Sequence, residues 1–293
     1  MGKTMRYLVS FIYLWLVCSI YSVEVHGHRG ARSKRPENTL AAFRYALAVG
    51  TPVLEMDLLV SGDGILVVHH DFHINLDLCR RITKTNPEHS GQEGPAIIDL
   101  NVAEIRTFDC GSIRNPKFPE QVLSPGEVIP TFDEVVELVK GEQNSAKVKW
   151  NLEMKSKQSS PAYSPEPQLF AQLVIEAITK HEIKENVILQ SFDYRTLEAA
   201  RRLDPFIKIS ALAGKRSPDP YDTLKKLRPD YISPDFTLVT PKLIKAAHSK
   251  AVKVIPWTVN NSQDWKKVLQ AKVDGIITDD PEALLKFLQT WTP

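Results

Sequence analysis

Four short stretches of this 293-residue chain combine carboxylates, imidazoles and cations, the groups that acid–base chemistry on an anion requires. They are His28-Arg29-Gly30, Glu55-Met56-Asp57, His69-His70-Asp71 and Glu153-Met154-Lys155. Successive side chains on a β-strand point to opposite faces. Glu55 and Asp57 are two residues apart, so we expect them to share one face of a strand, with Leu54, Met56 and Leu58 on the other.

The stretch around Glu153 alternates in the same way. Its polar face would carry Lys149, Asn151, Glu153 and Lys155, and its apolar face Val148, Trp150, Leu152 and Met154. If the polar faces line a barrel, Glu55, Asp57 and Glu153 are buried together, which is costly without a partner. One divalent cation would offset that cost, and ligation by oxygen alone favours Mg²⁺ or Ca²⁺ over zinc or copper. A salt-bridge network with Lys155 and Arg29 is the alternative.

Two histidines are expected beside these carboxylates. The turn signal Ser61-Gly62-Asp63-Gly64 lets the run Ile65–Val68 double back and bring His70 next to Glu55. His28 ends the preceding strand. A single histidine is more often structural, but two that flank a metal-bound anion suit a general base for the attacking group and a general acid for the leaving oxygen.

These side chains need a scaffold, and the rest of the chain predicts one from strict alternation of strands and helices. The predicted strands are Val23–His28, Val53–Val60, Lys147–Met154, Asn186–Leu189, Phe206–Leu212, Asp230–Ser233, Lys253–Thr258 and Gly275–Thr278. The predicted helices are Glu37–Val49, Phe132–Lys140, Pro167–His181, Tyr194–Leu203, Tyr221–Leu227, Pro241–Lys250, Ser262–Gln270 and Pro281–Leu288. Eight such units indicate an α/β fold of the (β/α)8 TIM-barrel type, whose catalytic residues lie at the carboxyl ends of the strands.

One connection is too long for this pattern. Residues 61–130 separate the second strand from its helix, and about 72–130 are polar and rich in Pro, Gly and Asn. An insertion at this place follows the carboxyl end of a strand, so we expect it on the catalytic face, where it would shape access of a substrate. The alternatives are an inert surface insertion and, for the whole chain, an open doubly wound sheet, although no glycine-rich dinucleotide turn follows the first strand.

The first 22 residues differ from the rest. Lys3 and Arg6 precede the uncharged, mostly apolar run Tyr7–Ile20, and Ser22 suits the last position before a cleavage. This predicts a signal peptide at 1–22, a barrel domain at 23–293 and an exported protein, periplasmic or secreted. The apolar run is shorter than the roughly 20 residues of a membrane span. We therefore expect no stable membrane insertion after cleavage, with an uncleaved N-terminal anchor as the alternative.

Cys79 and Cys110 remain after removal of that segment. In an oxidising compartment they could form a disulfide, and two unpaired thiols are the alternative. Their spacing fits no zinc-finger pattern. The formal net charge of +2 offers no basic surface of the kind that nucleic-acid binding needs.

In the stretches that carry the carboxylates and histidines, the chain resembles the glycerophosphodiester phosphodiesterase family. The matching pieces are His28-Arg29-Gly30, Pro36-Glu37-Asn38-Thr39, Glu55-Met56-Asp57, His70-Asp71, Glu153-Met154-Lys155, Gln190-Ser191-Phe192, Trp257-Thr258-Val259-Asn260 and Asp274–Asp279. They extend from residue 26 to about residue 282, and their combination is far more specific than any one of them. A departure is His69, where the family pattern leads us to expect a smaller or apolar residue. His73 has no expected role.

The resemblance implies a TIM barrel with an insertion between strand two and helix two, and it implies a role for each matched residue. The metal ligands would be Glu55, Asp57 and Glu153, and the acid–base pair would be His28 and His70. The phosphate would be held by Arg29 and Lys155. Gln190 would orient a ligand or cap a strand end, and Trp257 would line the substrate pocket or serve as a packing residue. The implied cofactor is one divalent cation, Mg²⁺ or Ca²⁺.

The implied reaction is hydrolysis of a small glycerophosphodiester, such as glycerophosphocholine, to glycerol 3-phosphate and an alcohol. The nucleophile is either water or the glycerol 2-hydroxyl. The alternatives are a related barrel phospholipase that acts on intact phospholipids and a noncatalytic binding protein. The choice of headgroup, of Mg²⁺ or Ca²⁺, and of oligomeric state does not follow from the residues.

Overall fold

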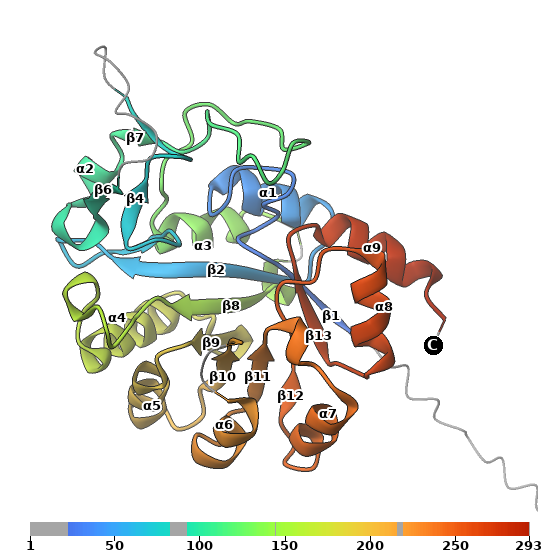
Figure 1. Ribbon diagram of the computed structural model, residues 1–293. Coiled ribbons are helices and arrows are strands. Elements are labelled where there is room, and N and C mark those ends of the chain that lie inside the picture. The colour runs from blue at the N-terminus through green and yellow to red at the C-terminus, as the bar shows by residue number, and fades with distance from the viewer. Residues whose placement is uncertain (1–22, 83–92, 144, 216–218, 293) are drawn as a thin grey trace, which may run out of the picture.

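Eight parallel strands form the barrel at the centre of the computed structural model, which describes residues 23–82, 93–143, 145–215 and 219–292 (Figure 1). The expected signal peptide lies outside these residues. In chain order the barrel strands are β1 (Glu24–Gly27), β2 (Val53–Val60), β8 (Lys149–Met154), β9 (Val187–Ser191), β10 (Lys208–Ala213), β11 (Tyr231–Pro234), β12 (Lys253–Val254) and β13 (Gly275–Thr278).

The strands pair in the order β12-β11-β10-β9-β8-β2-β1-β13, which puts the last strand of the chain beside the first. Backbone hydrogen bonds nearly close the ring, from Asp274 N to Val254 O (2.9 Å) and from Ile277 N to Pro256 O (3.0 Å). All carboxyl ends of parallel strands therefore meet on one rim. The predicted TIM barrel is confirmed.

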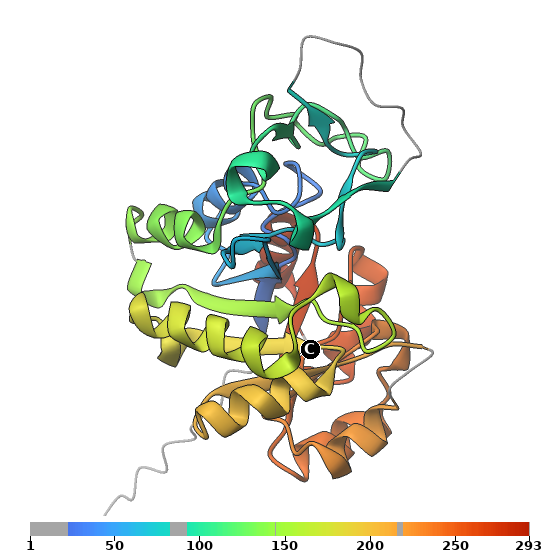
Figure 2. The ribbon, with the colours of Figure 1, turned by 90° about the vertical axis from the view of Figure 1, so that its left-hand side faces the viewer.

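A helix follows each barrel strand and covers the outside of the ring (Figures 1 and 2). These helices are α1 (Leu40–Ala48), α3 (Phe132–Lys140), α4 (Pro167–Lys180), α5 (Tyr194–Leu203), α6 (Pro220–Lys226), α7 (Pro241–His248), α8 (Ser262–Gln270) and α9 (Pro281–Thr290). Seven of them match the predicted helices within two residues. The exception is the helix expected at Glu37–Val49, which begins only at Leu40 because Thr39 caps it and Asn38 has a φ of 54°. Likewise, the strand expected at Lys253–Thr258 ends at Val254.

The alternation expected for β2 and β8 is confirmed by the packing. Leu54, Met56 and Leu58 are fully buried in the layer between barrel and helices, where they belong to one apolar cluster with Trp150 and Phe132. The opposite faces of the same strands point into the barrel. Below the rim, the barrel interior is filled by a small apolar group of Ile188, Tyr231, Ile255 and Ile277.

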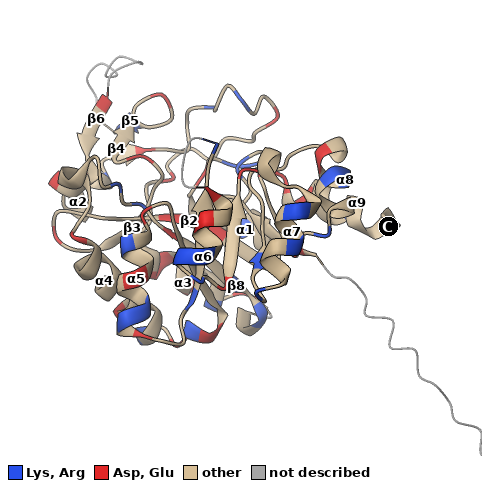
Figure 3. Cartoon of the chain, turned by 60° about the horizontal axis from the view of Figure 1, so that its bottom comes forward, with Lys and Arg blue, Asp and Glu red and all other residues tan. Residues whose placement is uncertain are grey.

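Positions of basic and acidic residues are interspersed along the helices in the view of Figure 3. Capping side chains fix the starts of several helices. Thr131, for example, accepts a hydrogen bond from Glu134 N, while the Glu134 carboxylate accepts one from Thr131 N. Among the described residues, no helix is both long and apolar enough to cross a membrane.

The insertion begins with the expected hairpin. Strand β3 (Leu66–Val68) runs antiparallel to β2, with Leu58 opposite Val68. Beyond it the segment contains more structure than its polar composition predicted, in two small sheets and a short helix. These elements are β4 (His73–Asn75), β5 (Arg80–Arg81), β6 (Glu93–Ala96), α2 (Val102–Ile105) and β7 (Phe108–Asp109), with β4 paired to β6 and β5 to β7. Figure 1 shows them beside the end of β2.

A separate apolar cluster and a disulfide hold the insertion together. Ile74, Ile97 and Phe108 are buried in this cluster, which also contains the bonded pair Cys79–Cys110. The question that the sequence left open is thereby answered in favour of the disulfide. The scarcity of apolar residues in the segment explains why a covalent link helps it to fold.

We expect the double variant Cys79→Ser/Cys110→Ser to unfold at lower urea concentration than the wild type. The bonded cysteines are 31 residues apart, and closing a loop of that length stabilises a fold by roughly 3 to 4 kcal/mol in the chain-entropy model. Urea unfolding followed by circular dichroism, with and without reductant, measures the difference. If reductant leaves the urea midpoint of the wild type unchanged, the prediction is contradicted. The double variant is the control, because it has no disulfide and reductant should not change its urea midpoint.

Candidate active site

Three buried carboxylates meet at the carboxyl rim of the barrel. Glu55 and Asp57 come from β2 and Glu153 from β8, and the strand register places Asp57 directly opposite Glu153. Each offers an oxygen, and these oxygens all lie within 4.8 Å of one another. Their side chains are almost fully buried. The structure thus brings together the three residues that the alternation pattern predicted.

Cations neutralise part of this charge. The Lys155 ammonium lies 2.9 Å from a Glu153 oxygen and 3.7 Å from Asp57 Oδ1, and Arg29 Nε lies 3.2 Å from Asp57 Oδ2. Arg29 also donates to Glu37, a fourth carboxylate, which belongs to the matched stretch Pro36–Thr39 but was given no role from the sequence. The salt-bridge network considered as an alternative therefore exists. The side chains of Arg29 and Lys155 pair with Asp57, Glu37 and Glu153, and Arg32 lies 3.6 Å from Glu37, but none of these three cations forms an ion pair with Glu55.

The negative charge that Arg29 and Lys155 leave on the carboxylates would suit a divalent cation. Asp57 Oδ1 is buried and accepts no hydrogen bond from the part of the chain that the structure describes. Burial, followed by the charges of Asp57 and Glu153, raises the pKa of Glu55 well above its usual value. Burial also opposes ionisation of Asp57, but the Arg29 guanidinium holds the pKa of that carboxyl well below its usual range. A hard cation prefers such carboxylate oxygens and would relieve their mutual repulsion.

Neutral donors orient the carboxylates. Gln190 donates from Nε2 to Glu55 Oε1 (2.8 Å), and the backbone N–H of Arg29 donates to Glu55 Oε2 (2.9 Å). Asn38 donates to Asp57 Oδ2 (2.8 Å) from a left-handed backbone conformation. Sequence reasoning left Gln190 between two roles and gave Asn38 none. In the structure both hold the carboxylates, as residues that support metal ligands do.

His28 lies just past the end of β1 and is held through Nδ1, while Nε2 is directed towards the acidic cluster. Its Nδ1 is 2.6 Å from Asp279 Oδ1, and its Nε2 is 3.9 Å from Glu55 Oε2. Burial, assisted by the charge of Arg32 and opposed by Asp279, lowers the pKa of His28 to about 4. At neutral pH the ring is therefore uncharged. The carboxylate partner places the proton on Nδ1, which leaves the lone pair of Nε2 facing the acidic cluster.

Asp279 is the main site residue that sequence reasoning missed. It follows β13, whose pairing with β1 brings it to His28 from 251 positions away. It also binds Arg32 (2.5 Å from Nε) and accepts a hydrogen bond from Asn260 (2.7 Å). The signal was present in the matched stretch Asp274–Asp279, because in a closed barrel the ends of the first and last strands are neighbours.

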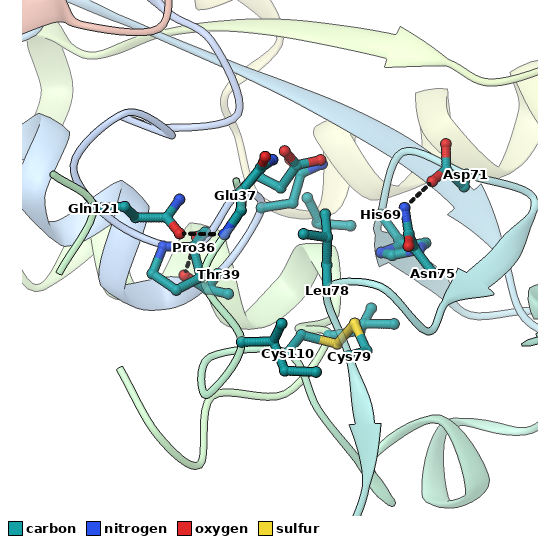
Figure 4. Close-up of a pocket in the computed structure, with 15 residues that line it drawn as sticks. Pro36, Glu37, Thr39, His69, Asp71, Asn75, Leu78, Cys79, Cys110 and Gln121 are labelled. Atoms are coloured by element: carbon teal, nitrogen blue, oxygen red, sulfur yellow. Dashed lines mark hydrogen bonds between the residues drawn. A yellow bond between two sulfur atoms is a disulfide. The ribbon is translucent and has the colours of Figure 1, made fainter. Parts of the chain in front are cut away.

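His70 and His69 point in opposite directions, as strand parity predicted. His70 Nδ1 lies 2.6 Å from Asp71 Oδ1, and its ring borders the cavity above the three carboxylates. His69 faces away, with Nε2 3.3 Å from the carbonyl oxygen of His73. Figure 4 shows His69 in a small pocket with Asp71, Asn75 and the Cys79–Cys110 disulfide.

A cavity of about 170 Å³ joins these groups. The two histidines, Arg29, Arg32, Glu55, Glu153 and Lys155 line its polar side, and Phe192, Leu212, Trp257 and Ile277 its apolar side. The Trp257 ring lies edge-on to Phe192 at 5.5 Å, and its indole N–H donates to Ser233 O (2.7 Å). Trp257 therefore lines the cavity and packs at the same time, so that both expected roles are compatible with its position.

Polar residues from several strands that converge on the carboxyl rim define an enzyme of the TIM-barrel class. A family model described as the glycerophosphoryl diester phosphodiesterase family matches residues 28–283, and the chain belongs to this family. The match covers all the residues that the sequence singled out as site residues.

Individual relatives agree with this assignment. The glycerophosphodiester phosphodiesterase of Caldanaerobacter subterraneus subsp. tengcongensis is 32% identical over 90% of this chain and 97% of that protein. A solved candidate glycerophosphoryl diester phosphodiesterase from Silicibacter pomeroyi is 28% identical with a TM-score of 0.83, over 91% of this chain and 93% of that one. A phosphodiesterase from Oleispira antarctica, solved with the product sn-glycerol-3-phosphate, shares the fold with a TM-score of 0.73 at 22% identity, over 91% of this chain and 97% of that one.

Proposed function

We propose that this protein hydrolyses small glycerophosphodiesters to glycerol 3-phosphate and an alcohol, with the help of one divalent cation and two histidines. The observation that carries the proposal is the arrangement of the rim. Glu55, Glu153 and two carboxylate-paired histidines line one cavity of a size that suits a small phosphodiester, and Asp57 completes the cluster of three buried carboxylates beside it. The name of the Caldanaerobacter relative and the product complex of the Oleispira protein support the substrate class.

Glu55, Asp57 and Glu153 would hold the cation, either Mg²⁺ or Ca²⁺. When bound there, such an ion polarises a nonbridging phosphoryl oxygen and offsets the charge that develops on it. Arg29 and Lys155, which line the same cavity, would contact the phosphate with their remaining N–H donors. The oxygen-only donor set favours a hard cation over zinc.

The two histidines would divide the proton transfers. His28 is neutral at pH 7 and has Nε2 directed at the cluster, so it is suited to remove a proton from the nucleophile, either water or the glycerol 2-hydroxyl. His70 lies nearer the mouth of the cavity with its side chain 34% exposed, where it would protonate the departing alcohol oxygen. Asp279 would hold the Nδ1–H group of His28 and thereby fix its tautomer. Asp71 would hold the Nδ1–H group of His70, whose acid form carries a second proton on Nε2, and this is the proton that passes to the leaving oxygen.

Release of glycerol 3-phosphate from glycerophosphocholine tests the proposal. The chain from residue 23 onward is treated with EDTA and then supplied with Mg²⁺ or Ca²⁺. We expect activity to disappear with the chelator and to return with at least one of the two ions. Inactivity with every ion on glycerophosphocholine, glycerophosphoethanolamine and glycerophosphoglycerol would refute the proposed function.

We expect Asp279 to affect the rate of hydrolysis indirectly, by orienting the ring of His28. In the variant Asp279→Asn the partner of Nδ1 is no longer charged, and kcat should fall by about 10²-fold while KM changes little, because orientation of a general base contributes to the transition state. Nitrogen NMR shifts of His28 should report a change of tautomer in the same variant. The control is Asn260→Ala, which removes another contact of the same carboxylate and does not line the cavity. An equal loss of kcat in both variants, or an unchanged His28 tautomer in Asp279→Asn, would argue against positioning of His28.

We also propose that residues 1–22 are a signal peptide and that the protein is exported. The disulfide Cys79–Cys110 supports this, because disulfides persist in oxidising compartments. N-terminal sequencing of the protein recovered from cell fractions should find Val23 as its first residue. A membrane-bound protein that still begins near Met1 would favour the uncleaved anchor.

A further inference from the structure

A chain of hydrogen bonds leads from the carboxylate cluster into the interior of the barrel. Its first member is Gln190, which donates from Nε2 to Glu55 Oε1. The amide oxygen of Gln190 accepts a hydrogen bond from Asn151 Nδ2 at 3.2 Å, and the same nitrogen lies 3.3 Å from Nδ1 of His26. His26 and Asn151 are fully buried, and neither lines the active-site cavity. They can therefore act on the site only through their neighbours.

The geometry of the barrel accounts for the order of this chain. In a TIM barrel the inward side chains form layers, and alternate strands contribute to each layer. His26 on β1 and Asn151 on β8 come from the first and third barrel strands, and Glu55 on β2 and Gln190 on β9 from the second and fourth. His26 pairs in register with Val53, which precedes Glu55 on its strand. The bond from Asn151 to Gln190 thus joins a deeper layer to the layer that carries Glu55.

The ionisation of Glu55 sets the direction of each bond. This step rests on the proposed function, because a carboxylate that binds a cation is ionised and only accepts hydrogen bonds. Gln190 must then turn its NH₂ group to Glu55 and its oxygen to Asn151. The NH₂ group of Asn151 meets that oxygen on one side and Nδ1 of His26 on the other, so Nδ1 must be unprotonated. Burial lowers the pKa of His26, which leaves an uncharged ring with its proton on Nε2.

Stability alone does not explain these two buried residues. Asn151 Oδ1 and His26 Nε2 form no hydrogen bond with the part of the chain that the structure describes, and the Glu24 carboxylate lies 3.8 Å from Nε2. A buried polar atom without a partner destabilises a fold, and an apolar side chain would avoid that cost. Space is nevertheless left for the ring, because a Cβ on Gly275 would come within 3.2 Å of His26 Nε2. The contacts that His26 and Asn151 do make lead towards Gln190.

We propose that His26 and Asn151 are positioning residues of the active site. They hold the amide of Gln190 in the orientation that donates to Glu55, and so keep this carboxylate in place for the divalent cation. Loss of a group that orients a metal ligand typically costs about 10- to 100-fold in ion affinity or activity. The support of the ion site then extends through the barrel interior to β1, beyond the residues that line the cavity.

Calorimetric titration with Mg²⁺ and Ca²⁺ tests the inference without relying on turnover. We expect Asn151→Val, which removes the donor to Gln190, to weaken binding of the preferred ion about tenfold. Gln190→Leu, which removes the donor to Glu55, should weaken it at least as much. Because Asn151 acts through Gln190, the double variant should bind the ion no more weakly than Gln190→Leu alone, whereas independent effects would multiply.

Two variants of His26 separate its hydrogen bond from its volume. His26→Leu removes the acceptor and should weaken ion binding about tenfold. His26→Asn is the conservative variant, because its side-chain oxygen can take the place of Nδ1 and accept from Asn151, and its ion affinity should stay near that of the wild type. The matched control is Ser210→Ala. Ser210 is a buried residue of β10 whose hydroxyl bonds that of Ser233 at 2.8 Å, and its loss should leave ion affinity unchanged.

Nitrogen NMR shifts of the wild type provide a second readout, since His26 should carry its proton on Nε2. A proton on Nδ1 would overturn the inference, because that nitrogen could not accept from Asn151. Unchanged ion affinity in both Asn151→Val and His26→Leu, multiplied effects in the double variant, or an equal loss in Ser210→Ala would overturn it too. In these cases the wild type still binds the ion and releases glycerol 3-phosphate, so the proposed function stands. A wild type that binds neither ion and cleaves no diester would instead refute the proposed function, and this inference with it.

Discussion

The variant Glu153→Gln is expected to lose hydrolysis and binding of the divalent ion together, yet to be more stable than the wild type when both are free of metal. Glu153 is buried beside Glu55 and Asp57, and burial raises the pKa of its carboxyl, so its negative charge is unfavourable in the folded protein without an ion. The neutral amide removes this charge at nearly the same volume. Loss of a metal contribution of several kcal/mol corresponds to a fall in kcat of about 10³-fold or more.

Calorimetric titration with Mg²⁺ and Ca²⁺ measures ion binding, and urea unfolding in EDTA measures stability. The control is Asp204→Asn, since the hydrogen bond from Lys184 lowers the pKa of Asp204 and its charge is therefore favourable. That variant should bind the ion normally and unfold at lower urea concentration, the opposite pattern. Wild-type ion affinity in Glu153→Gln would contradict the assignment of Glu153 as a ligand.

The variants His28→Ala and His70→Ala should each lower kcat by about 10² to 10⁴-fold, the usual contribution of a general base or acid, while they keep the ion. A substrate whose alcohol is p-nitrophenol distinguishes the two roles. Such a group departs without receiving a proton, so this substrate should largely rescue His70→Ala and should leave the defect of His28→Ala in place.

His69→Gln is the control for both variants, because His69 faces away from the cavity and contacts the carbonyl oxygen of His73. It should keep kcat within a few-fold of the wild type. Rescue of His28→Ala instead of His70→Ala would reverse the assignment of acid and base. A severe defect in His69→Gln with a normal His70→Ala would show that the neighbouring histidine is the catalytic one.

The barrel was predictable because its signals are local. The eight barrel strands and the helices that follow them were located from apolar runs and proline-containing helix starts. Alternation along β2 and β8 was enough to place Glu55, Asp57 and Glu153 on the inner face. The errors concerned the ends of single elements. Helix α1, for example, begins only at Leu40, because Asn38 has a left-handed backbone conformation and donates a hydrogen bond to Asp57.

The insertion was not predictable in the same way. Its strands are two to four residues long, too short for any periodicity to emerge, and they pair across the chain. Its stability depends on the contact between Cys79 and Cys110, which spacing alone left open. A cavity of about 530 Å³ that this segment lines together with His70 and Lys155 therefore had no signature in the sequence.

The sequence by itself determined the fold class, the family, and the inward face of the acidic residues, since backbone geometry imposes the alternation wherever a strand forms. Only the tertiary structure decided the partners of those residues. Asp279 reaches His28 because β13 closes the barrel against β1, and Gln190 on β9 reaches Glu55 on β2 past the intervening strand β8. Such contacts depend on the closure of the whole ring, and no local pattern encodes which ends of distant strands will meet.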